Sequence, residues 1–96
     1  MQRRVFKMRE MIQDGEREGL LRYLNYLRGR GVSLCEIFPE MIEANGGPTK
    51  FLIESGLSRP TVSKLMQARP GLSPNTIRRT MAVFGMVPGH KPKVSS

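Results

Sequence analysis

The sequence predicts an all-α fold, a small helical domain with an N-terminal helical extension. Apolar residues recur every three or four positions through most of the chain, which is the spacing of one face of a helix. Serines and prolines that suit helix starts alternate at short intervals with glycines that suit helix ends. Alternation with period two is a serious rival only at residues 3 to 8. The length of 96 residues fits one compact domain.

The first expected helix covers residues 3 to 13. Its apolar side chains Val5, Met8 and Ile12 fall on one side at helical spacing. Gly15 is a suitable end for it. The strand alternative applies only to the first half of this segment.

The second expected helix covers residues 16 to 28 and carries a stripe of leucines, Leu20, Leu24 and Leu27. The "GRG" that begins at Gly29 ends it. Such a stripe can pack against the core of its own chain or form a seam between two copies. The sequence leaves both open, and the seam is the basis for predicting dimerisation through these three leucines.

A third group of apolar residues lies around Pro39. Ser33 can cap a turn that leads into this group. Pro39 then either opens a new helix or kinks the one already begun. Met41 and Ile42 give the helix its apolar side, and the "NGG" at residues 45 to 47 ends it.

Three short helices are expected to follow in quick succession. The first is "PTKFLIES" at residues 48 to 55, and Gly56 ends it. The second is capped by Ser58 or Arg59, and the third begins at the Ser-Pro pair at residues 73 to 74. The residues expected to be buried are Phe51, Leu52, Val62, Leu65, Met66, Ile77, Met81 and Phe84.

The positive charge of the chain is unevenly placed. Residues 1 to 54 hold all eight acids and nine of the sixteen basic residues, a balance of +1. Residues 55 to 96 hold the other seven basic residues and no acid, a balance of +7. Solvated surfaces normally mix the two signs, so a half of one sign indicates a polyanionic partner.

Several classes of function are disfavoured. With one histidine, His90, one cysteine, Cys35, and no acid after Glu54, the chain offers no catalytic triad, metal-ligand cluster or Gly-rich phosphate loop. We therefore expect a protein that is not an enzyme and uses neither cofactor nor metal. A single cysteine favours a reducing compartment such as the cytoplasm. No apolar run approaches the ~20 residues that cross a bilayer, and no signal peptide is expected.

The stretch "GLSRPTVSKLMQARPGLSPNTIRR" resembles the DNA-binding headpiece of lactose-repressor-type regulators. The longer stretch from "EANGGPTKFLIESGLSRPTVSKL" to "SPNTIRRTMAVFGM" is similar to Cro/repressor-type and HigA-type antidote proteins. The resemblance to this repressor-like helix-turn-helix superfamily covers about residues 39 to 88. Leu52 departs from the families' usual alanine at the contact between the two helices, which implies a wider crossing.

The resemblance implies that the helix after Gly56 enters the major groove of DNA. Arg59 is then suited to a bidentate contact with guanine O6 and N7, whereas Pro60 can offer only apolar contact, for instance to a thymine methyl group. The expected base-contacting residues are Arg59, Pro60, Ser63, Lys64 and Gln67. The expected phosphate-contacting residues are Thr49, Lys50, Ser58, Thr61, Ser73, Asn75 and Thr76.

Several residues, including two of the expected phosphate contacts, can also be explained by structure alone. Ser58 and Ser73 can be helix caps alone, or one hydroxyl can cap the helix and contact phosphate. Arg78 and Arg79 lie on a helix expected to pack on the core, which favours a solvated face for both. Cys35 is interpreted as a small core hydrophobe.

Three segments are expected: an N-terminal helical extension at 1–31 that can serve as a dimerisation or partner surface, a DNA-binding domain at 32–88, and a flexible basic tail at 89–96. The favoured function is a sequence-specific double-stranded DNA-binding transcriptional regulator, a repressor that binds a palindromic operator as a homodimer. The alternative is an antitoxin that binds its own promoter and neutralises a toxin. A non-specific or RNA-binding basic module is less favoured, because Phe84 is the only aromatic residue of the basic half.

Overall fold

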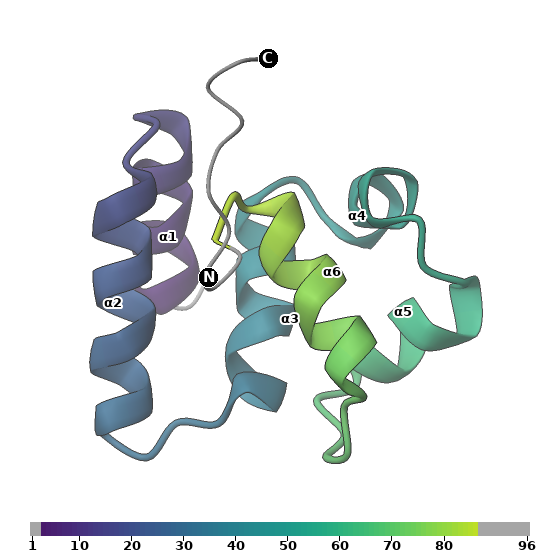
Figure 1. The fold of residues 1–96 in the computed structure, drawn as a ribbon. Coiled ribbons are helices and arrows are strands. Elements are labelled where there is room, and N and C mark those ends of the chain that lie inside the picture. The colour runs from purple at the N-terminus through teal and green to yellow at the C-terminus, as the bar shows by residue number, and fades with distance from the viewer. Residues whose placement is uncertain (1–2, 87–96) are drawn as a thin grey trace, which may run out of the picture.

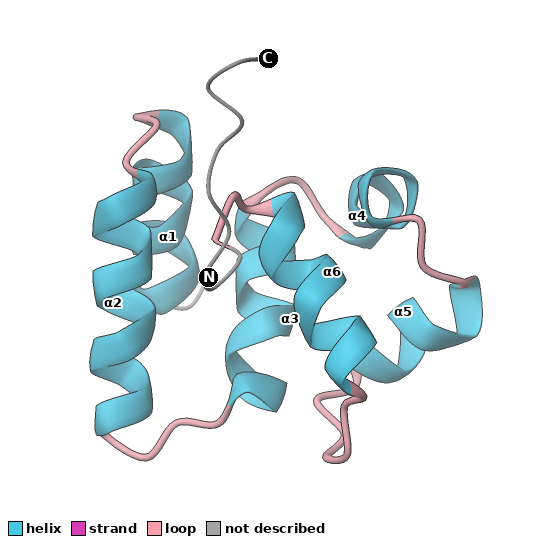
Figure 2. Cartoon of the chain, viewed as in Figure 1, coloured by secondary structure: helices cyan, strands magenta, loops and turns pink. Residues whose placement is uncertain are grey.

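The structure is a computed structural model and describes residues 3–86. In that range the chain forms six helices and no strand, so the predicted all-α fold is confirmed (Figures 1 and 2). The tail predicted at 89–96 lies outside the described residues. The helices are α1 (Arg3–Gln13), α2 (Arg17–Gly29), α3 (Leu34–Ala44), α4 (Pro48–Ser55), α5 (Arg59–Met66) and α6 (Pro74–Val83).

The helices are arranged around α3. The hairpin of α1 and α2 lies on one side of it, and α4, α5 and α6 lie on the other (Figure 1). Helix α3 packs against α1, α4 and α5, and α6 packs against α4. Among residues 3–86 no helix is long and apolar enough to cross a bilayer.

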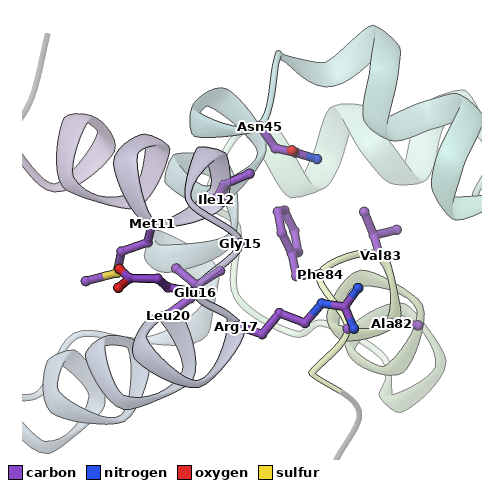
Figure 3. Close-up of a pocket in the computed structure, with 11 residues that line it drawn as sticks. Met11, Ile12, Gly15, Glu16, Arg17, Leu20, Asn45, Ala82, Val83 and Phe84 are labelled. Atoms are coloured by element: carbon purple, nitrogen blue, oxygen red, sulfur yellow. The ribbon is translucent and has the colours of Figure 1, made fainter. Parts of the chain in front are cut away.

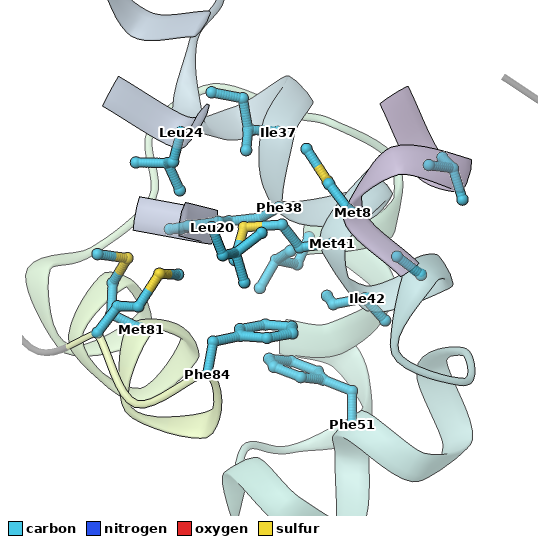
Figure 4. Packing of buried hydrophobic residues seen from close by; sticks show 14 of the residues in the cluster. Met8, Leu20, Leu24, Ile37, Phe38, Met41, Ile42, Phe51, Met81 and Phe84 are labelled. Carbon is cyan, nitrogen blue, oxygen red and sulfur yellow. The ribbon is translucent and has the colours of Figure 1, made fainter. Parts of the chain in front are cut away.

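All six helices contribute to one continuous core. Figure 4 shows side chains of the hairpin, α3, α4 and α6 meeting in it. Helix α3 supplies its centre, because Ile37, Phe38, Met41 and Ile42 are all completely buried. Met8 of α1 is completely buried as well. The boundary expected at residue 31 therefore divides helices that share a single core.

The leucine stripe of α2 lies inside this core. Leu20, Leu24 and Leu27 are exposed by 3%, 2% and 5%. Residues this deeply buried cannot form a seam with a second copy while the fold is intact. The dimerisation surface predicted on them is therefore misplaced, and core packing, the other interpretation of the stripe, accounts for them.

An ion pair also fastens the hairpin to α3. Arg4 Nη2 lies 2.8 Å from Glu40 Oε2, whereas Glu40 Oε1 is buried with no hydrogen-bond partner among residues 3–86. Tyr23 packs beside this pair, and its pKa is raised mainly by burial, with Arg4 opposing the shift and Glu40 adding to it. Lys7 lies 4.8 Å from the centre of the Tyr23 ring. The contacts bind α1, α2 and α3 into one unit.

Two local alternatives of the sequence are resolved. The strand considered at residues 3 to 8 is wrong, since those residues begin α1. Pro39 does not open a new helix, because it lies inside α3, which runs from Leu34 to Ala44. Proline has no N–H, so the carbonyl of Cys35 cannot receive its usual helical hydrogen bond. The buried residues on both sides of Pro39 compensate for that loss.

Candidate nucleic-acid interface

Helices α4 and α5 are joined by a tight turn, as the motif predicted. Gly56 takes the left-handed conformation at φ 71° that ends α4. The hydroxyl of Ser55 accepts a hydrogen bond from Leu57 N–H at 3.2 Å and holds the turn. Val62 and Leu65 are buried and hold α5 on the core. The opposite face of α5 is left exposed.

Arg79 of α6 stabilises this turn from outside. Its Nη1 donates a hydrogen bond to the Ser55 carbonyl at 3.3 Å. The last carbonyls of a helix have no partner within the helix, and a cation there also complements the helix dipole. Arg79 is exposed, as predicted, and it makes this contact in addition. Sequence reasoning had no signal for this contact, because it joins residues 24 positions apart.

Gly56→Ala is expected to lower the melting temperature by about 4–8 °C, which corresponds to about 1 kcal/mol in a domain of this size. The left-handed backbone disfavours any Cβ, and the added methyl group would lie 3.2 Å from Arg79 Nη1. Gly29→Ala is the control, because Gly29 is helical and its added Cβ would meet nothing within 4 Å. That change should be neutral or stabilising. Equal destabilisation by both would contradict the assigned turn.

The exposed face of α5 and the start of α4 form a groove of about 440 Å³, the α4–α5 groove. Four residues predicted from the sequence to contact DNA line it: Thr49, Arg59, Ser63 and Gln67. The other lining residues are Pro48, Leu52, Val62 and Met66. Gln67 Nε2 lies 3.3 Å from Ser63 Oγ, which orders two of the polar groups. The structure thus brings together residues from two helices that the sequence had grouped by motif alone.

Eight predicted contact residues lie outside the groove lining, among them Pro60, Lys64 and Lys50. Pro60 and Lys64 stand one turn apart on α5, and both are exposed. Lys50 is exposed near the start of α4, with its Nζ 3.5 Å from Asn45 Oδ1. Their positions leave both lysine ammonium groups accessible to a phosphate.

Helices α5 and α6 begin with the same kind of cap. The Thr61 N–H donates to Ser58 Oγ at 3.3 Å, and the Thr76 N–H donates to Ser73 Oγ at 3.1 Å. In each pair the two hydroxyls also share a hydrogen bond, at 2.8 Å and 2.9 Å. The cap interpretation of both serines is confirmed, and both remain exposed at helix N-termini.

The predicted phosphate contact of Thr76 needs correction. Thr76 is only 7% exposed, and its hydroxyl is already paired with Ser73. It cannot reach a phosphate without leaving the core. Asn75, beside it, is exposed and keeps the expected role.

The charge of residues 55–86 is of one sign. Among residues 55–86 the charged side chains are Arg59, Lys64, Arg69, Arg78 and Arg79, all basic. The nearest acid, Glu54, points to Asn45, with Oε1 3.4 Å from Asn45 Nδ2. The basic side chains of α5 and α6 therefore favour an anionic partner.

A second hollow of about 440 Å³ lies between the α1–α2 turn and the end of α6 (Figure 3). Met11, Leu20 and Phe84 contribute apolar surface to it, and Arg17 and Asn45 contribute polar groups. It shares no lining residue with the α4–α5 groove. Among residues 3–86 no group of three or more potential metal-binding side chains comes together.

Comparison with protein-family models, with curated proteins and with solved structures gives no match to this chain. The likeness of residues 39 to 88 to repressor-like domains therefore rests on the motif in the sequence. What the interface binds must follow from its geometry and charge.

Proposed function

We propose that the protein is a sequence-specific double-stranded DNA-binding transcriptional regulator that represses by occupying an operator. The observation that carries this proposal is the α4–α5 groove. Its polar residues come from the start of α4 and the exposed face of α5, which is the pairing that a helix laid in the major groove requires. Its surroundings carry basic side chains and no acid among residues 55–86.

In this proposal α5 contacts bases and α4 contacts the phosphate backbone. Helix α5 lies in the major groove, where Arg59, Ser63 and Gln67 meet base edges. Helix α4 crosses the backbone, and Lys50 contacts a phosphate. Ser58 and Ser73 present hydroxyls at helix N-termini, where the backbone N–H groups and the helix dipole favour an anion.

We propose that two copies bind a palindromic operator, because one small module buries too little surface for tight specific binding. The buried leucines of α2 do not supply the contact between copies. The hairpin instead exposes Phe6 by 55%, Leu21 by 37% and Tyr26 by 57%. These side chains offer apolar surface to a second copy.

The same exposed side chains favour the second candidate function, an antitoxin. In that proposal the α4–α5 groove binds the protein's own promoter, while the hairpin contacts and neutralises a toxin. A protein pull-down with the Phe6→Ser and Tyr26→Ser variants would separate the two roles. Loss of a partner without loss of DNA binding would favour the antitoxin.

DNA binding is expected to weaken steeply with salt. If each copy neutralises about five phosphates, the logarithm of the association constant should fall with the logarithm of salt concentration at a slope of about −4 to −5 per copy. Fluorescence anisotropy with a labelled duplex measures this slope. Lys50→Ala should make it shallower by about 1.

Lys7→Ala is the matched control for that measurement. It removes the same charge from α1, where Lys7 covers the Tyr23 ring. Its salt slope should equal that of the unmodified protein. A slope near zero would contradict the electrostatic part of the proposal, and an equal change in both variants would contradict the placement of the interface.

A further inference from the structure

The less exposed lining residues of the α4–α5 groove, Leu52, Val62 and Met66, form an apolar floor. The exposed lining residues form its rim and are polar except for Pro48. Leu52 and Met66 are half-buried in it, and Val62 is 5% exposed. All three pack against the main core, so the floor is held in place. Thr49, Arg59, Ser63 and Gln67 supply the hydrogen-bonding groups around it. A partner of this groove should therefore present one apolar feature surrounded by polar ones.

The major-groove edge of DNA has one such feature. Thymine carries a 5-methyl group beside its O4 acceptor, and the other base edges offer only hydrogen-bond donors and acceptors among the groups that a protein reads there. We propose that the α4–α5 groove recognises a thymine methyl group through Leu52 and Met66. This inference rests on the proposed function and names what the floor of the groove reads.

Charge and position favour this occupant over an apolar segment of another protein. Arg59 stands at the rim, and no acid occurs in the sequence after Glu54. The base edges of DNA are attached to a polyanionic backbone, and this basic surface attracts that backbone.

The contact was expected from the sequence at Pro60, which can offer only apolar surface. Pro60 is exposed but does not line the groove. A methyl group against Pro60 alone would keep one side in water. On the floor it would meet two side chains from two helices. Removal of the thymine methyl group should therefore weaken binding more if the methyl group lies on the groove floor than if it lies against Pro60.

The experiment uses a duplex that carries the operator selected by this protein, with deoxyuridine replacing one thymidine at a time. Uracil keeps the hydrogen-bonding groups of thymine and lacks only its methyl group. At one thymine in each half-site the affinity should fall about fourfold, the value for burying one methyl-sized group. At other positions the replacement should change little. This scan of uracil replacements needs only the unmodified protein.

Three variants locate the contact. Leu52→Ala should abolish the difference between thymine and uracil at the sensitive position, whereas Pro60→Ala should preserve it. Ile53→Ala is the matched control on α4, because Ile53 is 78% exposed and does not line the groove. Circular dichroism checks that each variant is folded. Met66→Ala replaces Leu52→Ala if the latter does not fold.

The outcomes are distinct. Absence of any uracil-sensitive position in a selectively bound operator would overturn the inference and leave the proposed function intact. A sensitivity lost in Pro60→Ala and kept in Leu52→Ala would also overturn it. Failure of the protein to prefer any duplex would instead overturn the proposed function on which it rests.

Discussion

The Leu24→Asp variant is expected to be unfolded at room temperature. Leu24 is 2% exposed within the core shared by all six helices. Truncating a buried leucine typically lowers the free energy of unfolding by about 2–5 kcal/mol. Aspartate adds the cost of burying a carboxylate in this hydrophobic cluster. The sum is comparable to the whole stability of a small domain, about 5–15 kcal/mol.

Leu21→Asp is the control, since Leu21 lies on the same helix and is 37% exposed. It should remain folded and lose at most about 1 kcal/mol. Circular dichroism and urea denaturation compare the two variants. A folded Leu24→Asp variant that is monomeric, beside a dimeric unmodified protein, would restore the leucine seam and contradict the core described above.

The Arg59→Ala variant is expected to lose discrimination at one base pair of each half-site. Arg59 is exposed at the first turn of α5 and lines the α4–α5 groove. A bidentate contact with guanine contributes about 1–3 kcal/mol of discrimination, a factor of about 5 to 150. The measurement compares affinities for a panel of single-base operator changes. Only the guanine that Arg59 contacts should become interchangeable.

Lys50→Ala is the matched comparison for this panel. Lys50 lies on α4 outside the groove lining and is expected to contact only phosphate. Its loss should weaken all operators by a similar factor and leave their ranking unchanged. If Arg59→Ala behaves in the same way, Arg59 does not read a base.

The helix boundaries could be predicted from the sequence because their causes are local. The starts of α5 and α6 each follow a serine whose hydroxyl accepts from the threonine three residues on. Gly56 ends α4 in the left-handed conformation that glycine tolerates. These interactions span a few residues, so a single stretch of sequence contains all their partners.

The errors concern partners that are distant in sequence. The stripe of α2 shows which face is apolar, and nothing in it says whether the covering surface belongs to the same chain. Here Leu24 is covered by the chain itself. The hydrogen bond of Arg79 was not foreseen because its acceptor is the carbonyl of Ser55, 24 positions away. Thr76 was expected from the resemblance to contact phosphate, and here it is buried.

The candidate site could be predicted in part for the same reason. The motif identified Thr49, Arg59, Ser63 and Gln67, and the packing of α4 on α5 places all four around one groove. The motif gave no role to Met66 beyond the core, and it treated Leu52 only as a departure that widens the helix crossing. Both residues form the floor of that groove. A floor depends on how two helices cross, which the spacing of residues within each helix does not specify.

Selection of bound sites from random duplex DNA is the decisive test of sequence-specific recognition by α5. The protein is incubated with the random pool near physiological salt, and retained duplexes are amplified and sequenced over several rounds. We expect an enriched operator that contains guanine and thymine and occurs as two inverted half-sites about one helical turn apart. A retained pool that stays random in sequence would contradict sequence-specific recognition by α5 and identify a general basic module instead.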